Sequence, residues 1–358
     1  MKEIIRAAVA VIVVSALLLY INSQLGKTSG STGSDTITVY NWGEYLDPEL
    51  LKQFTEETGI RVIYETFDSN EAMMTKIQQG GTSYDLAMPS EYMIEKMKEE
   101  DLLIPLDHSK IPNLKNIDPY FLDLPFDPGN EYSVPYFWGT VGIAFNPDLL
   151  EEDFDFTSWE DLWSQELRQQ VILVDSAREV MGMGLNSLGY SLNSTDDSEL
   201  DAASAKLDEL TPNVKAIIGD EIVEMMRRNE AAIALTWSGQ ALDMMYVNES
   251  IDFAVPEEGS NLWFDNMIIP KTAANVDGAH QFINFMLDAE VAAQNADWVG
   301  YSTPNAAAIE LMDPEVTGDE RFYPDEEIRG RLEVYRNLGP EMTGEYNERF
   351  LRFKMGMN

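Results

Sequence analysis

Strand-like and helix-like patterns alternate along this chain from residue 36 onward, and this alternation limits the possible folds more than any other feature. Alternating apolar residues predict strands, and apolar residues spaced three and four apart predict helices. The predicted strands are 37–40, 61–66 and 85–88, and the predicted helices between and after them are 48–58, 70–79 and 91–100. Gly59 is a suitable helix stop, and Asp68-Ser69 is a suitable helix cap. Strands that alternate with helices in this way are typical of a parallel sheet covered by helices, so we predict an α/β fold.

A second α/β pattern follows a long apolar segment. Residues 133–145 are apolar and extended, and they are too many for one simple strand, so we expect them to cross from one domain to another. Beyond them we predict a helix at 159–163, a strand at 171–174, helices at 179–188 and 200–210, and a strand at 232–237. A strand at 267–269 and a helix at 279–287 would then return to the first domain. The 358 residues are enough for the two domains that this pattern predicts.

The first 22 residues have the composition of an export segment. Lys2 and Arg6 carry positive charge, and residues 7–21 are apolar apart from Ser15 and Tyr20. This apolar run is shorter than the roughly 20 residues of a spanning helix. Two alternatives stay open for residues 1–22, an export signal or an uncleaved membrane anchor, and the lack of a clear small-x-small cleavage site slightly favours the anchor. Residues 23–35 are predicted to be a flexible linker. We expect the protein in the periplasm or on the outer face of the cytoplasmic membrane, tethered there if the segment is not cleaved.

The composition excludes several classes of function. There are 63 acidic residues against 24 Lys and Arg, and the net charge of −39 argues against a nucleic-acid partner. The charge attracts cations, although we attribute it mainly to the solubility of an exported protein. The chain has no cysteine, which excludes disulfides, thiolate chemistry and a lipid anchor on an N-terminal cysteine.

Catalytic motifs are also absent from the sequence. The two histidines, His108 and His280, leave little scope for a histidine-based metal site or a Ser-His-Asp triad. The sequence has no nucleophile elbow, zinc-binding helix or phosphate loop. Paired carboxylates for glycoside hydrolysis and scattered tyrosines for ferric iron are weak alternatives. We therefore expect neither an enzyme nor a cofactor.

Aromatic and acidic residues follow the first predicted strand in the segment Asn41-Trp42-Gly43-Glu44-Tyr45. In α/β sheets ligands bind beyond the carboxyl ends of the strands. Aromatic faces together with a carboxylate attract an organic cation, because both carry negative potential. The alternative is that Trp42 and Tyr45 are core residues beside the start of a helix.

Three further segments place aromatic residues at predicted strand ends, with a hydroxyl or carboxylate group nearby. They are Ser90-Glu91-Tyr92, Trp237-Ser238-Gly239 and Trp263-Phe264-Asp265. The turn at 175–179, which contains Asp175 and Glu179, is either a substrate-binding position or a helix cap, and the sequence alone does not separate the two.

Taken together, these segments resemble the periplasmic polyamine-binding proteins of bacterial ABC importers, the spermidine/putrescine-binding family. The resemblance runs from about residue 36 to about residue 324, which is most of the chain. It is carried by ordered matches that include Tyr40-Asn41-Trp42-Gly43-Glu44-Tyr45, Asp68-Ser69-Asn70-Glu71, Pro135-Tyr136, Ala177-Arg178-Glu179, Trp237-Ser238-Gly239, Trp263-Phe264-Asp265 and Gly300-Tyr301-Ser302-Thr303-Pro304-Asn305.

The resemblance implies a periplasmic-binding-protein clamshell, in which two α/β lobes are joined by crossover strands and ligand binds in the cleft between them. Lobe 1 would comprise residues 36–143 and 265–310, and lobe 2 residues 144–264 and 311–358. Carried over position by position, the ligand-binding residues would be Trp42, Glu44, Tyr45, Ser90, Tyr92, Glu179, Trp237, Trp263, Asp265 and Tyr301. The implied function is to bind spermidine, putrescine or both and, by lobe closure, to deliver the polyamine to the permease subunits of an ABC importer. We expect a monomer, and a sensor that does not transport is the alternative.

Two positions depart from the pattern of the family. Ser176 stands where the spermidine binders carry an aspartate, and Leu351 aligns with a family glutamine near the C-terminus. The loss of one carboxylate weakens the case for a triply charged ligand, whereas the large aromatic set suits a long ligand such as spermidine. The choice between spermidine and putrescine therefore stays open.

Overall fold

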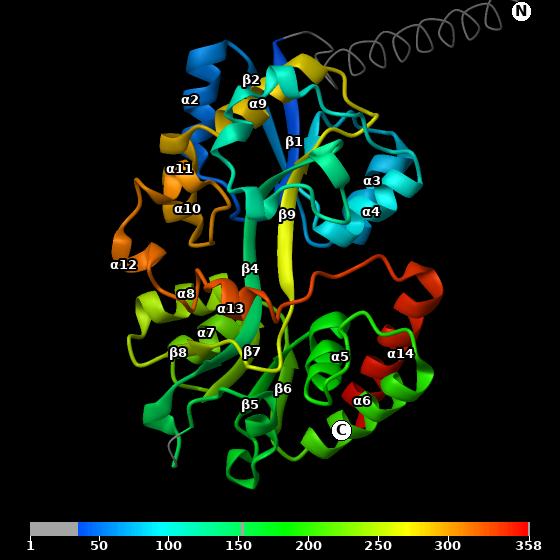
Figure 1. Cartoon of the computed structure of the whole chain (residues 1–358), viewed down its shortest axis with the longest axis vertical. Helices are drawn as coiled ribbons and strands as arrows, with labels where there is room; N and C mark the ends of the chain where they lie inside the picture. Colours follow the sequence, from blue (N-terminus) through cyan, green and yellow to red (C-terminus); the bar gives the residue numbers. More distant parts are fainter. Residues whose placement is uncertain (1–34, 152–153, 357–358) are drawn as a thin grey trace, which may run out of the picture.

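Two lobes lie one above the other along the long axis of the molecule (Figure 1). The structure is a computed structural model that describes residues 35–151 and 154–356. The predicted export or anchor segment, and the predicted linker up to residue 34, lie outside these residues. Within the described ranges, no helix is both long enough and apolar enough to cross a membrane.

The upper lobe contains the first α/β unit that the sequence predicts. Its strand β1 lies between β2 and β3 and is parallel to both, so the predicted parallel arrangement is confirmed. The strands are β1 (Thr36–Trp42), β2 (Arg61–Phe67) and β3 (Leu86–Ala87), and the helices are α2 (Pro48–Thr58), α3 (Asn70–Gln79), α4 (Glu91–Glu99), α9 (Val276–Met286), α10 (Ala289–Val299) and α11 (Ala306–Ile309).

Helix ends in this lobe follow from local sequence. The Asp47 side chain accepts the N–H of Glu49 at the start of α2, and Gly59 ends that helix with a φ of 74°, which glycine adopts without strain. Ser69 caps α3, as its sequence predicts.

The lower lobe repeats the α/β arrangement. Its strand β5 lies between β6 and β7 and is parallel to both, and β8 pairs with the long strand β4. The elements are β5 (Val171–Val174), α5 (Ala177–Asn186), α6 (Asp197–Leu210), β6 (Val214–Ile218), α7 (Glu221–Arg227), β7 (Ile233–Trp237), α8 (Ser238–Val247), β8 (Asp252–Ala254) and α14 (Gly339–Gly356). The short helices α12 (Pro314–Thr317) and α13 (Glu326–Arg329) lie on the chain that leads to α14.

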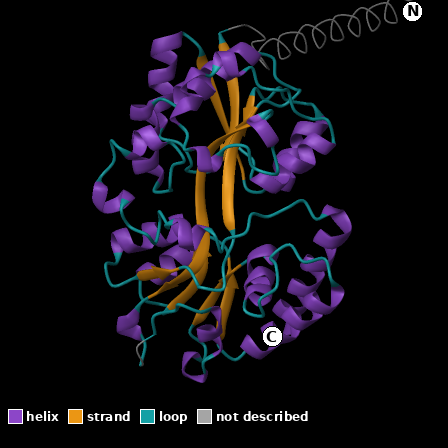
Figure 2. Ribbon diagram, viewed as in Figure 1, coloured by secondary structure: helices purple, strands orange, loops and turns teal. Residues whose placement is uncertain are grey.

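Two strands connect the lobes. β4 (Ser133–Phe145) and β9 (Leu262–Ile268) pair antiparallel and run from one lobe to the other, with helices on both sides (Figures 1 and 2). They join all strands into one sheet of order β2-β1-β3-β9-β4-β7-β5-β6, so the predicted crossover at 133–145 is confirmed. Along β4, Trp138 belongs to the apolar core of the upper lobe and Val141 to that of the lower lobe. The predicted lobe boundaries in residue numbers stay a prediction.

Several elements differ from their predictions. The predicted helix at 159–163 is a short 3-10 turn, with a capping box in which Ser158 and Asp161 bond to each other's backbone. Trp263 and Asp265 lie inside β9, whereas the sequence placed them before a strand that starts at 267. β6, α7, α8, β8, α10 and the four helices from α11 to α14 were not predicted.

Candidate ligand-binding site

The carboxylate of Asp265 is the centre of the candidate site. It is buried in β9 and accepts two hydroxyl hydrogen bonds, from Tyr45 at 2.7 Å and from Ser90 at 2.7 Å. Burial raises the pKa of Asp265 to about 6, although both hydrogen bonds act in the opposite direction. A carboxylate has about four acceptor positions. Asp265 can therefore accept further donors, and an ammonium group would also neutralise its charge.

Three aromatic rings form a connected group that includes this carboxylate: Tyr45 bonds to Asp265, Tyr301 lies in its field, and Trp263 packs on Tyr301. The ring centroids of Tyr45 and Tyr301 are 5.4 Å apart, those of Trp263 and Tyr301 are also 5.4 Å apart, and both pairs meet edge to face. Tyr301 comes from the upper lobe, and its ring lies against Gly239 of α8 in the lower lobe. The approach is so close that a Cβ on Gly239 would lie only 1.2 Å from the ring. The rings therefore form an aromatic wall that spans the junction of the lobes.

Ser90 and Tyr92 are linked by Asn70. The side-chain amide of Asn70, at the start of α3, donates to Ser90 Oγ at 3.1 Å and to the Tyr92 hydroxyl at 3.0 Å. In the sequence, Asn70 belongs to the segment Asp68-Ser69-Asn70-Glu71 that carries the family resemblance, and its role in connecting two candidate site residues was not predicted. Because Ser90 also forms a backbone bridge with Asp265, this network fixes the position of the carboxylate.

Glu179 and Trp237 come from the lower lobe. Glu179 is buried in the first turn of α5 and accepts the hydroxyl hydrogen bond of Ser176. Burial raises the pKa of Glu179, and bonds from Ser176 and Trp237 oppose this rise. The buried Tyr335 lies in the field of Glu179, and its pKa is raised mainly by burial and then by this charge. No motif pointed to Tyr335.

The two interpretations of the turn at 175–179 can now be compared. The Ser176 side chain does not cap α5, because its hydroxyl bonds to Glu179 instead. Asp175 is exposed and forms an ion pair with Lys354 of α14 at 2.6 Å. Asp175 is therefore held by Lys354, Ser176 is held by Glu179, and the binding role of Glu179 stays a prediction. Leu351, the aligned position of the family glutamine, is 54% exposed on α14, so that alignment finds no support here.

Trp42 and Glu44 lie at the carboxyl end of β1. The ring of Trp42 packs on Phe67, with centroids 4.5 Å apart, and its buried indole N–H has no hydrogen-bond partner in the described part of the chain. Glu44 is exposed, with a φ of 52°, in the turn that follows the strand. The structure thus joins Tyr45, Ser90, Asp265, Trp263 and Tyr301 directly and Tyr92 through Asn70. Among the described residues, no hydrogen bond or ion pair joins Glu44 to this group.

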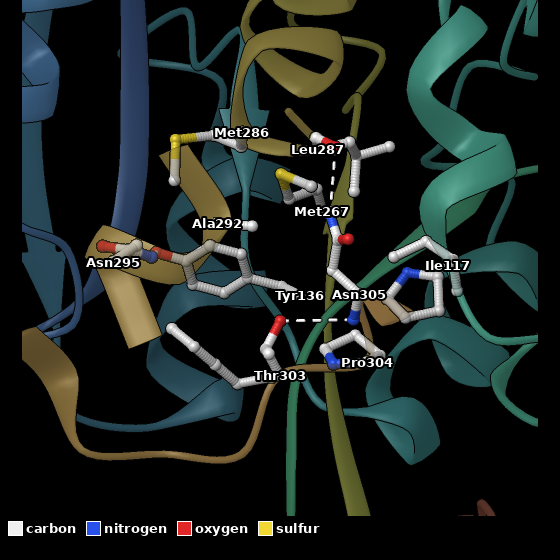
Figure 3. Close-up of a pocket in the computed structure, with 12 residues that line it drawn as sticks. Ile117, Tyr136, Met267, Met286, Leu287, Ala292, Asn295, Thr303, Pro304 and Asn305 are labelled. Atoms are coloured by element: carbon white, nitrogen blue, oxygen red, sulfur yellow. Dashed lines mark hydrogen bonds between the residues drawn. The ribbon is translucent and has the colours of Figure 1, made fainter. Parts of the chain in front are cut away.

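Tyr136 supports the site from behind. Its hydroxyl donates to the backbone oxygen of Tyr45 at 2.7 Å and accepts from the Asn295 amide at 2.8 Å. Figure 3 shows these two side chains facing each other beside a small cavity in the upper lobe. The cavity has a volume of about 10 Å³, which is enough for one water molecule at most. It is a packing gap that lies behind the candidate site and is too small for a ligand.

Comparisons with known proteins agree with this fold. Residues 49–323 match the family model of bacterial extracellular solute-binding proteins. The spermidine/putrescine-binding periplasmic protein of Salmonella typhimurium is 41% identical, with 91% of this chain and 93% of that protein covered. The protein of the same description from Escherichia coli is 42% identical, with 90% and 92% covered. A solved spermidine/putrescine ABC transporter substrate-binding protein from Streptococcus pneumoniae is 57% identical, with a TM-score of 0.84 and 90% and 100% covered.

The two lobes, the crossover strands and the carboxylate between aromatic rings define a solute-binding protein of the clamshell type. The chain belongs to the bacterial extracellular solute-binding proteins. Within that family it is similar to the spermidine/putrescine-binding members, which confirms the resemblance found in its sequence.

Proposed function

We propose that this protein binds spermidine, putrescine or both between its lobes and delivers the polyamine to the permease of an ABC importer. The observation that carries the proposal is the buried carboxylate of Asp265, which is held by Tyr45 and Ser90 and lies beside the rings of Trp263 and Tyr301. Similarity to proteins described as spermidine/putrescine-binding supports the choice of ligand.

The chemistry of the site suits a chain of methylene groups that carries charged amines. Aromatic faces pack against methylene groups and attract the positive charge next to them. A buried carboxylate is costly unless it is paired, and a ligand ammonium would supply that pair. We propose that the ligand extends from Asp265, in the upper lobe, to Glu179 and Trp237 in the lower lobe, and that Trp42, Glu44 and Tyr92 line the same cleft.

The ligand would hold the lobes together. A molecule that contacts both lobes stabilises the closed arrangement over open ones, because only the closed arrangement provides both sets of contacts. We propose that the closed form of a monomer docks on the permease. The family is extracellular, so we further propose that the protein works in the periplasm or on the outer face of the membrane.

Isothermal titration of the purified protein with spermidine, putrescine and spermine tests the proposal, with an amino acid and a sugar as controls. We expect one polyamine site per chain and no heat of binding from the controls. A folded protein that binds none of the three polyamines would refute the ligand assignment. The rank order would also decide between spermidine and putrescine.

A further inference from the structure

Glu91 is a buried carboxylate with one unused oxygen. It is the first residue of α4, its exposed fraction is 0%, and its Oε2 accepts the backbone N–H of Phe264 at 3.0 Å. Its Oε1 is also buried and has no hydrogen-bond partner among the residues that the structure describes. Buried polar atoms without a partner are rare and cost free energy, so this oxygen calls for a physical explanation.

The position of Glu91 ties it to the candidate site. Along the chain it lies between Ser90, which donates to Asp265, and Tyr92, which accepts from Asn70. The residue that it bonds, Phe264, lies between Trp263 and Asp265 in β9. Glu91 thus adjoins site residues on two different elements of the upper lobe.

Charged and titratable groups from both lobes surround the carboxylate. Those that interact with Glu91 electrostatically are Asp265 of β9, Arg178 of α5, Tyr92 of α4 and Tyr335 on the segment before α14. Tyr92 and Tyr335 also lie in the field of Glu179. Glu91 therefore lies within electrostatic range of groups from both lobes and next to the proposed ligand-binding residues.

Arg178 is the one cation in this set, and its hydrogen bonds go to residues other than Glu91. Its guanidinium donates to Asn193 at 3.0 Å and to the backbone oxygen of Arg336 at 3.3 Å, and it lies 4.1 Å from the ring centroid of Tyr335. Nε of Arg178 is also buried without a partner, but no hydrogen bond or ion pair among the described residues joins it to Glu91. In this arrangement Oε1 of Glu91 is open to a donor from outside the chain.

We propose that Glu91 is a further ligand-binding residue, whose Oε1 accepts a hydrogen bond from an amine nitrogen of the bound polyamine. It would supply the negative charge that the spermidine binders of the family provide at the position of Ser176. This inference rests on the proposed polyamine function.

Binding of an ammonium group at Glu91 would release a proton. Burial raises the pKa of Glu91 to about 8, opposed by the backbone N–H bonds, so the free protein holds this carboxyl mostly protonated at pH 7. An ammonium group favours the ionised form, so binding releases a proton. Affinity should then rise with pH between 6 and 8, by up to about tenfold per unit.

The test compares wild type with Glu91→Gln by titration calorimetry at pH 7. Each titration is run in phosphate and in Tris. Because the two buffers have different ionisation enthalpies, the difference in binding heat gives the number of protons released. Glutamine keeps an oxygen for the N–H of Phe264, so the fold is preserved. The control is Glu100→Gln, an exposed position at the other end of the same helix. We expect Glu91→Gln to weaken spermidine binding at least tenfold, to release nearly one proton fewer and to flatten the pH profile, while the control stays within twofold of wild type.

The outcomes separate this inference from the proposed function. If wild type binds polyamine and Asp265→Asn weakens that binding, but Glu91→Gln keeps wild-type affinity and proton release, the role of Glu91 is refuted and the function stands. If wild type binds no polyamine, both fail. If Glu91→Gln does not fold by circular dichroism, the proton count of wild type decides, because release of less than about 0.3 proton at pH 7 contradicts a carboxyl that ionises on binding.

Discussion

Replacing Asp265 by asparagine should weaken the binding of polyamine and, at the same time, stabilise the free protein. Both effects follow from one carboxylate that is buried among aromatic rings and hydroxyl groups. Loss of its charge removes the partner of a ligand ammonium, and we expect this to cost about 2–5 kcal/mol of binding free energy. Unchanged affinity would remove Asp265 from the site.

The gain in stability can be worked out from the pKa. Burial raises the pKa of Asp265 from 3.8 to about 6 in the folded protein. A group whose pKa is raised on folding stabilises the fold below its unfolded pKa and loses that effect as the pH rises through the folded value. At pH 7 the ionised carboxylate therefore destabilises the fold by about 3 kcal/mol. Asparagine avoids this cost, but it offers only one oxygen to the two hydroxyl donors. The weaker hydrogen bonding lowers the free energy of unfolding by about 1 kcal/mol. We expect a net gain of about 1–2 kcal/mol.

Urea unfolding of the ligand-free proteins at pH 7 and at pH 4 measures this gain. The variant should be more stable than wild type at pH 7, and the difference should disappear at pH 4, where the wild-type carboxyl is protonated in the folded state. Glu44→Gln is a matched control, since that side chain is exposed and should have little effect on stability at either pH. A variant that is less stable than wild type at pH 7, or a difference independent of pH, would refute the reasoning.

Three further predictions concern the aromatic wall and the contacts between the lobes. Trp263→Ala should weaken polyamine binding by about 2 kcal/mol, as measured by titration calorimetry. Trp159→Ala should instead lower the free energy of unfolding in urea by about 3–5 kcal/mol, because that ring is 1% exposed. Equal losses of binding in the two variants would indicate general unfolding. Gly239→Ala should weaken polyamine binding at least tenfold, because its methyl group would clash with the ring of Tyr301 and hold the lobes apart. In X-ray scattering, the ligand-bound variant should have a larger radius of gyration than ligand-bound wild type. An unchanged radius and affinity would contradict this. Asn337→Ala removes the 3.0 Å hydrogen bond that the side-chain amide of Asn337 donates to Glu99 of α4 and should speed ligand release about fivefold in stopped flow. Equal release rates would contradict this.

Much of the fold could be predicted because local signals agreed with the final structure. The limits of α2 and α3 match their predictions, since Asp47, Ser69 and Gly59 make the capping contacts that their sequence indicates. The elements that were missed have weaker local signals. Strand β6, for example, is half exposed along most of its length and is held by its pairing with β5.

The candidate site could be predicted only in part. Aromatic residues beside hydroxyl and carboxyl groups pointed to segments around Tyr45, Ser90 and Asp265, but not to their mutual hydrogen bonds. Those bonds join residues 220 and 175 positions apart, and local pattern carries no information about such distances. Asn70 and Tyr335 were overlooked for the same reason, since each is identified only by its neighbours in space.

Strand β4 offers an internal measure of how the lobes depend on each other. Its backbone pairs with β9 at residues 133–140 and with β7 and β8 at residues 141–145. Amide hydrogen exchange along these 13 consecutive residues therefore reports the opening of one lobe at one end and of the other lobe at the other end. Lobes that open independently would give two different exchange free energies on a single strand. A ligand that couples the lobes would bring the two values together.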